Sequence, residues 1–439
     1  MELSSERVHQ RLKKKKLLRV ATKYPNLTRQ FLYSKGVTQF QLVQSLGSTE
    51  VAPFTGTAEI ISDITSTGAT LKANSLRILK DGEILSAVQE ERFSRKKHDS
   101  RFPENAIKYC LIEENIDISD LDSIVYYEKP WLKKARQLYA GQYSEVFSRK
   151  NLPSNYVKQF GIDKIDYYVD HHKSHAAASY YSSPYDEACI ITIDAIGEWE
   201  TLTIWYAWGS HFEKRYSVSY PNSLGLWYSA MTQRLGLKPQ EDEFILMGMA
   251  AWGKQDDDLQ SIMYNDFFGY ANELELKQNL HRGCLDYEPS IYPDNGTEQW
   301  KFDIAANVQT ICEWQIAKVF KKAKELVPET DNMCYSGGVA LNCVANSLVV
   351  EKQYPNMWIL PNPGDAGSSL GCAAYVGGEH IDFDSAFLGY DIKGKYPVKQ
   401  VVKELLKGNL VGVANGRACL LYTSPSPRDK RQARMQSSA

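Results

Sequence analysis

Three of the chain's 8 histidines lie within five residues, in the stretch DHHKSHAAASYY that runs from Asp170 to Tyr181. The alanine-rich segment that follows Ser174 is typical of a helix. A helix here places His171 and His175 four residues apart on one face. That spacing presents two imidazoles to one cation. The spacing alone is equally compatible with two solvated histidines near a helix start.

Two aspartates are candidates for the remaining ligands of such a site. Asp194 ends the apolar strand CIITIDA, and Asp365 lies between a predicted strand and a predicted helix in PNPGDAGSS. Two imidazoles and two carboxylates suit a divalent metal such as iron or zinc, with one position left for substrate. The alternatives are a turn cap for Asp194 and a helix N-cap for Asp365.

Glycine-containing turns supply a second kind of candidate site. In SGGVALN, residues 336–342, Gly337 and Gly338 would let backbone N–H groups approach a phosphate or ribose, with Asn342 at the end of the loop. In DAIGEW, Gly197 forms a comparable turn that is a candidate contact for a phosphate or for the metal. The alternative for SGGVALN is an ordinary tight connection, because no P-loop Gly-Lys-Ser/Thr sequence follows.

The segments around these residues predict the elements that position them. Residues 188–221 predict three antiparallel strands joined by short turns. Residues 332–351 and 357–378 each predict a strand, a loop and a helix. This mixture predicts an α/β fold in which the loops collect at the strand ends.

Composition excludes several functional classes. The formal net charge is −2 over 439 residues, which gives no general bias toward nucleic acid or an anionic membrane. No apolar run of about 18 residues is present, so no membrane span is expected. The 8 cysteines are scattered without a C-x-x-C pair, which indicates reduced thiols in a cytoplasmic protein. A homodimer would be ordinary for such a protein.

Seven stretches together resemble the O-carbamoyltransferases of the NodU/CmcH type. They follow the family's order across residues 76–417: QEERFSRKKHDSRFP, DHHKSHAAASYYSSP, TIDAIGEW, PNSLGLWYSA, ILMGMAAWG, SGGVALN and PNPGDAGSSLG. The resemblance implies a duplicated, actin-like mixed-sheet domain of the RNase H-like type, followed by a YrdC-like α/β domain. It also implies that carbamoyl phosphate and ATP form carbamoyl-adenylate. The carbamoyl group would then pass to a hydroxyl of a small acceptor, such as a sugar, an antibiotic or a nodulation factor.

The resemblance also assigns roles to residues. It places the iron ligands at His171, His175, Asp194 and Asp365, and the nucleotide-binding loop at Gly337, Gly338 and Asn342. We expect the metal to act as a Lewis acid and His172 to serve as the catalytic base. The alternatives are an actin-like ATPase or sugar kinase, and a nucleotide- and metal-binding protein without catalysis.

The chain departs from this family at both ends, which predicts four segments. They are a poorly patterned, weakly ordered and mis-joined extension (1–76), the actin-like metal domain (77–380), the start of a truncated YrdC-like domain (381–417) and a non-native tail (418–439). The tail resembles sequencing-adapter read-through; the alternative is a short disordered basic tail. The first phosphate-side loop, which carries a His-Asp pair in the family, has no counterpart here. Ala195 also replaces a family glycine, which would cost about 1 kcal/mol at a positive φ.

Overall fold

The chain forms two compact units, residues 1–81 and 82–439, and each is described by itself. The computed structural model describes residues 17–22, 28–29, 32, 40–44, 58, 60–62, 84–96, 102–146, 158, 165–269, 274–284, 293–350, 354, 356–383, 391–392, 397–409, 411 and 416–417. The predicted tail at residues 418–439 lies outside these ranges.

The first unit contains a small parallel sheet rather than only an extension. Its strand order is β2-β1-β3, with β1 at Leu18–Thr22, β2 at Phe40–Gln44 and β3 at Ile60–Ser62. Val20 and Ala21 in the central strand are buried. Strand β1 is thus paired on both sides, and the assignment of residues 1–76 as a mis-joined extension stays a prediction.

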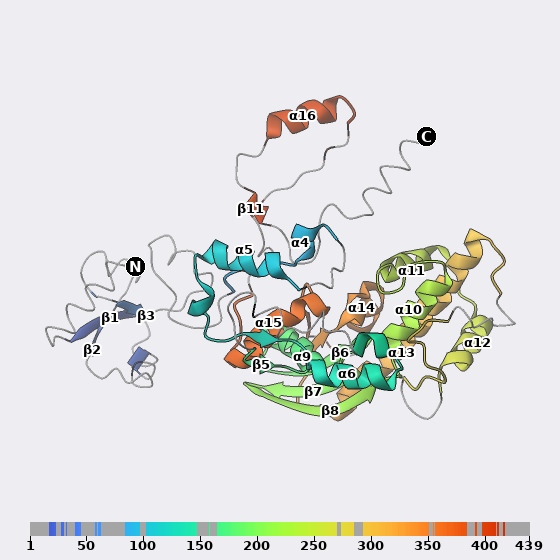
Figure 1. Ribbon diagram of the computed structural model, residues 1–439, viewed down its shortest axis with the longest axis horizontal. Coiled ribbons are helices and arrows are strands. Elements are labelled where there is room, and N and C mark those ends of the chain that lie inside the picture. Colours follow the sequence, from blue (N-terminus) through green and yellow to red (C-terminus); the bar gives the residue numbers. More distant parts are fainter. Residues whose placement is uncertain are drawn as a thin grey trace. The chain divides into compact units, whose positions relative to one another are not determined.

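The second unit is built on a five-stranded mixed sheet of order β10-β9-β6-β7-β8 (Figure 1). Its strands are β6 (Glu187–Ile193), β7 (Glu200–Trp208), β8 (His211–Ser219), β9 (Asn332–Ser336) and β10 (Asn356–Ile359). The first three form an antiparallel meander, whereas β9 runs parallel to both β6 and β10. The predicted meander, strand–loop–helix units and α/β class are therefore confirmed.

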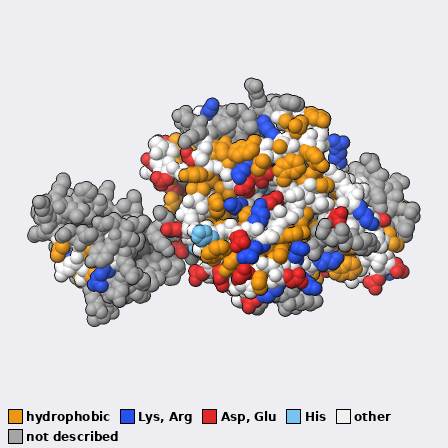
Figure 2. Space-filling view, turned by 90° about the horizontal axis from the view of Figure 1, so that it is seen from below, with side chains coloured by type: hydrophobic (Ala, Val, Ile, Leu, Met, Phe, Trp, Pro, Cys, Tyr) orange, Lys and Arg blue, Asp and Glu red, His pale blue; other side chains and the backbone are white. Residues whose placement is uncertain are grey.

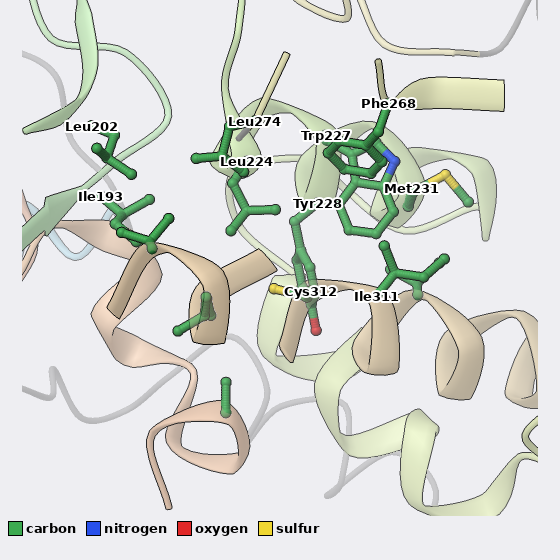
Figure 3. Packing of buried hydrophobic residues seen from close by; sticks show 14 of the residues in the cluster. Ile193, Leu202, Leu224, Trp227, Tyr228, Met231, Phe268, Leu274, Ile311 and Cys312 are labelled. Carbon is green, nitrogen blue, oxygen red and sulfur yellow. The ribbon is translucent and has the colours of Figure 1, made fainter. Parts of the chain in front are cut away.

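Helices cover both faces of this sheet, because alternate strand residues point to opposite sides. Cys189, Ile191 and Ile193 of β6 pack against α10 (Leu224–Arg234), α12 (Asp257–Phe267) and α13 (Glu298–Leu326). Figure 3 shows part of this core, where Trp227 and Phe268 lie near Ile311. Ala188 and Ile190 face α9 (His171–Tyr181) and α15 (Asp365–Gly377) instead. The sheet thus separates a large apolar core from the layer that carries the histidines.

Small residues let α9 and α15 cross closely. A Cβ at Gly371 would overlap the Ser174 carbonyl oxygen and lie 2.6 Å from the Ala178 nitrogen, so only glycine fits between the two backbones. The crossing brings the first turn of α15 toward the first turn of α9, and Figure 1 shows the two helices side by side. The alanines in SHAAAS, residues 174–179, therefore pack against a helix in the tertiary structure.

The remaining described elements are short or lie at the margins. They are α4 (Glu91–Ser94), α5 (Glu104–Glu114), η2 (Ile118–Asp120), β4 (Val125–Tyr126), α6 (Pro130–Tyr139), α7 (Tyr143–Val146), β5 (Tyr167–Tyr168), α11 (Glu243–Met249), η4 (Ala250–Trp252), η5 (Gly338–Leu341), α14 (Cys343–Val350), β11 (Asp391–Ile392), α16 (Val398–Leu406) and β12 (Gly416–Arg417). Within the described ranges, the parallel pair β4–β5 and the antiparallel pair β11–β12 are the only other sheets of the second unit. A duplicated mixed sheet and a YrdC-like start therefore remain predictions.

Surface and thiol chemistry agree with the composition. Acidic and basic side chains are interspersed with apolar ones on the face shown in Figure 2. The seven cysteines in the described part of the chain are free, and five of them are buried. None of the described helices is both long and apolar enough to cross a membrane.

The helix crossing generates a test of stability. Replacing Gly371 by alanine should lower the free energy of unfolding by about 1–3 kcal/mol, because two backbones must separate to admit the methyl group. Gly377→Ala in the same helix is the matched control, since its Cβ would meet nothing within 4 Å. Urea denaturation measures the free energy of unfolding of both variants and of the wild type. Equal stability of Gly371→Ala and the wild type would contradict the described crossing.

Candidate metal centre

The first turn of α9 is held by a buried carboxylate. The Glu198 side chain accepts the backbone N–H of His171 at 3.1 Å and that of Lys129 at 2.8 Å. A carboxylate at this position satisfies a free helix N–H and interacts favourably with the helix dipole. Sequence reasoning missed Glu198, although its place in the turn DAIGEW was a weak signal.

Four predicted ligands converge beside this turn. The Nε2 atoms of His171 and His175 lie 3.1 Å apart. The Asp194 Oδ2 atom lies 2.9 Å from His171 Nε2 and 3.5 Å from His175 Nε2. The Asp365 Oδ1 atom lies 3.5 and 3.4 Å from the same two nitrogens. All four ligand atoms lie within 4.8 Å of one another.

These separations fit one bound cation. Ligand atoms about 2.1 Å from an ion lie about 3.0 Å apart at neighbouring corners of an octahedron and about 3.4 Å apart in a tetrahedron. The donor set of two imidazole nitrogens and two carboxylate oxygens suits a borderline divalent metal. His171, His175 and Asp194 are buried, whereas the Asp365 side chain is 59% exposed. The group is therefore open to solvent on the Asp365 side.

Neighbouring hydrogen bonds orient the ligands. The backbone N–H of Gly338 donates to Asp194 Oδ1 at 3.2 Å, which leaves Oδ2 directed at the histidines. The buried Ser368 hydroxyl lies 3.2 Å from His175 Nδ1 and so fixes the ring with Nε2 toward the cluster. Partners of this kind set the orientation and basicity of metal ligands.

The pKa shifts within the group follow from the contact between its imidazoles and its carboxylates. Burial by itself lowers the pKa of His175, but the carboxylates of Asp194 and Asp365 reverse this and raise it to about 9. Burial disfavours the charged form of Asp194, yet hydrogen bonds from His171 and His175 hold its pKa well below the usual range. Positive charge is thus favoured at the point where the four side chains meet, and a dication would supply it.

The glycines predicted to bind nucleotide all lie beside these ligands. Gly337 has a φ of 92°, and a Cβ there would overlap the Ile193 carbonyl. A Cβ at Gly338 would lie 2.9 Å from Asp194 Oδ1, and one at Gly197 would lie 2.9 Å from the His172 ring. Each glycine therefore permits a close approach to the ligand group. Their contact with a nucleotide stays a prediction.

Asn342 has a structural role in the protein. Its amide forms a reciprocal pair with the Gln309 amide, at 3.0 Å in both directions. Its Oδ1 also accepts the Ala345 backbone N–H at 3.1 Å and so caps α14. These bonds hold the Asn342 amide against α13 and α14, and its contact with a nucleotide stays a prediction.

His172 does not face the group of ligands. It is fully buried, with Nδ1 2.5 Å from the Thr192 hydroxyl and Nε2 2.8 Å from the Glu200 carbonyl oxygen. Burial, followed by the neighbouring His171, lowers the pKa of His172 well below its usual range. Both nitrogens are occupied, so the expected role as catalytic base is not supported by this geometry.

The replacement of glycine by Ala195 causes no backbone strain. Its φ is not positive; the described non-glycine residues with positive φ are Arg95, Asn115, Gln240 and Leu274. The residue that must lack a side chain at this contact is Gly225, because a Cβ on Gly225 would lie 2.8 Å from the Ala195 backbone. The turn after Asp194 therefore accommodates alanine.

The amino-terminal part of the chain is similar to a different family. A model of ATP phosphoribosyltransferase matches residues 2–108. The ATP phosphoribosyltransferase of Nitrobacter winogradskyi is 63% identical over 68 residues, which is 16% of this chain and 21% of that protein. Such a match covers about a fifth of that enzyme.

The larger part of the chain matches a different set of proteins. An uncharacterized Synechocystis protein is 34% identical over 340 residues, covering 69% of this chain and 55% of that protein. The nodulation protein NolNO of Sinorhizobium fredii is 28% identical, covering 69% and 46%. The chain thus spans about half the length of these relatives. The solved full-length HypF in its phosphate- and nucleotide-bound form has a TM-score of 0.36 and 15% identity, covering 52% of this chain and 45% of that one.

One family model accounts for most of the sequence, including all four residues of the candidate metal centre. The model of the carbamoyltransferase N-terminus matches residues 69–161 and 142–374, which together make up more than half of the chain. The resemblance found in the seven sequence motifs is therefore confirmed: the chain belongs to the carbamoyltransferase family, through its N-terminal domain.

Proposed function

We propose that the second unit is the metal-bearing transfer domain of an O-carbamoyltransferase. The observation that carries this proposal is the convergence of two imidazoles and two carboxylates at cation-ligand spacing within a chain of this family. The acceptor would be a hydroxyl of a small molecule, and the exposed side of Asp365 is where it would enter. Iron or zinc suits the donor set.

The residues of this chain would bind and orient the reactants. His171, His175, Asp194 and Asp365 would hold the metal, which when bound supplies Lewis-acid polarisation of a carbonyl or phosphoryl oxygen. The acceptor oxygen would bond to the carbamoyl carbon while the bond to the phosphate oxygen of AMP breaks. The hydroxyl proton would pass to water, because His172 has no nitrogen free to take it.

Formation of carbamoyl-adenylate would belong to a separate YrdC-like module. Residues 77–380 would form the transfer domain and residues 381–417 would begin that module, of which α16 and the β11–β12 pair are described. The donor would thus derive from carbamoyl phosphate and ATP.

The first unit would take no part in this chemistry. Its relatives are phosphoribosyltransferases, and the matching stretch is a small share of their length. The change from one family model to the other along the chain, with both models matching residues 69–108, supports the proposal that residues 1–76 derive from a different gene.

Metal binding is the first test of the proposed site. The wild-type chain should bind one Zn²⁺ or Co²⁺, and His175→Ala should weaken binding by more than about 100-fold, because a ligand contributes more than a residue that supports one. His211→Ala is the matched control, since His211 is exposed on the β8 edge strand. Calorimetry and the absorption spectrum of bound Co²⁺ measure the metal affinity of both variants and of the wild type. Wild-type affinity in His175→Ala would refute the metal site.

Transfer can be separated from donor synthesis. With carbamoyl phosphate, ATP and a YrdC-like module from a relative added in trans, the chain should transfer labelled carbamoyl to hydroxyl acceptors. His175→Ala should abolish this transfer, and His211→Ala should not. Absence of transfer by the wild-type chain under these conditions would contradict the proposed transfer function.

The proposed join between unlike segments can be read from DNA. Resequencing the source across codons 50–80 should reveal a different reading frame or a chimeric junction. An uninterrupted gene confirmed in the source would show that the two segments are naturally fused.

A further inference from the structure

A chain of hydrogen bonds runs from the sheet to His172. Its links are Trp205 Nε1 to Thr203 Oγ1 at 2.6 Å, Thr203 Oγ1 to Thr192 Oγ1 at 2.5 Å, and Thr192 Oγ1 to His172 Nδ1 at 2.5 Å. The last link joins His172 Nε2 to the Glu200 carbonyl oxygen at 2.8 Å. All four side chains are buried, with at most 3% exposure.

Chemistry fixes the direction of every bond. An indole nitrogen can only donate and a carbonyl oxygen can only accept, so Trp205 starts the chain and Glu200 ends it. Thr203 must then donate to Thr192, and Thr192 to His172 Nδ1. In the reverse direction, the Thr203 hydroxyl hydrogen would have no acceptor among the described residues. The arrangement that satisfies every donor therefore holds His172 as the neutral Nε2–H tautomer.

This tautomer anchors the metal-binding helix on two sides. His172 lies in the first turn of α9, between the ligand His171 and the ligand His175. Thr192 ties its Nδ1 to β6, and Glu200 ties its Nε2 to the start of β7. The Gly197 backbone packs against the ring, so the imidazole can neither rotate nor shift without breaking a bond.

We propose that Thr192 and Thr203 are positioning residues that anchor His172 through this chain of hydrogen bonds, and that this anchor sets the rotation of α9 at which His171 and His175 converge. The proposal rests on the metal site of the proposed function. Supporting hydrogen bonds keep a ligand group within a fraction of an ångström of its binding geometry.

Thr203→Val tests the proposal, because valine keeps the shape of threonine and removes the central hydroxyl. Zn²⁺ affinity of the full chain should fall about tenfold. Thr203→Ser should stay within about twofold of the wild type, because serine restores the hydroxyl. Thr232→Val is the control: Thr232 is equally buried in α10, and its hydroxyl bonds the Tyr228 carbonyl. It should leave Zn²⁺ affinity unchanged.

A measurement on the wild type keeps the test independent of folding. Nitrogen-15 spectra of the histidine-labelled chain should show His172 protonated at Nε2 and unprotonated at Nδ1. An Nδ1–H form or an imidazolium would overturn the proposal, as would wild-type Zn²⁺ affinity in Thr203→Val or equal losses in the valine and serine variants. If the wild type bound no Zn²⁺, the metal site would fail, while the spectra would still decide the anchor.

Discussion

The candidate site of the second unit depends on one constraint: two imidazoles and two carboxylates must be held close together. The two Nε2 atoms lie 3.1 Å apart, and each carboxylate oxygen lies within 3.5 Å of both. Bringing such side chains together costs free energy, because they lose solvation and like groups repel each other. The scaffold must compensate for this cost, and here different elements supply the groups. Helix α9 supplies both histidines, β6 ends at Asp194, and α15 begins at Asp365. The close crossing at Gly371 brings the two helices together, and α9 packs against the sheet.

The segment from Asp194 to Glu200 contributes to this arrangement through several residues. Asp194 is a candidate ligand, and the lack of a side chain at Gly197 leaves room for the imidazoles. Glu198 then caps the first turn of α9, and the Glu200 carbonyl receives His172. Helix position and ligand position are therefore set by one turn, so a local change in it would disturb both. The residues of the turn are therefore positioned by the two paired strands β6 and β7 that flank it.

The two units differ in their relatives as well as in structure. The first has a small parallel sheet and relatives among phosphoribosyltransferases, whereas the second has the mixed sheet and belongs to the carbamoyltransferases. The core of the second unit lies between its own sheet and its own helices, with Ile191 and Trp227 fully buried within it. Its stability therefore has a source within residues 82–439.

The sequence by itself determined the fold class and all four candidate ligands. Apolar alternation marks strands, and the four-residue spacing of His171 and His175 fixes them on one helical face regardless of context. Only the tertiary structure decided which remaining polar residues serve the site. Helical spacing turns His172 away from the face of His171 and His175, but only the tertiary structure places it against Thr192. Asn342 pairs with Gln309, and Glu198, for which the turn DAIGEW was only a weak signal, caps α9. Such roles arise from contacts between residues distant in sequence, which periodicity and spacing do not encode.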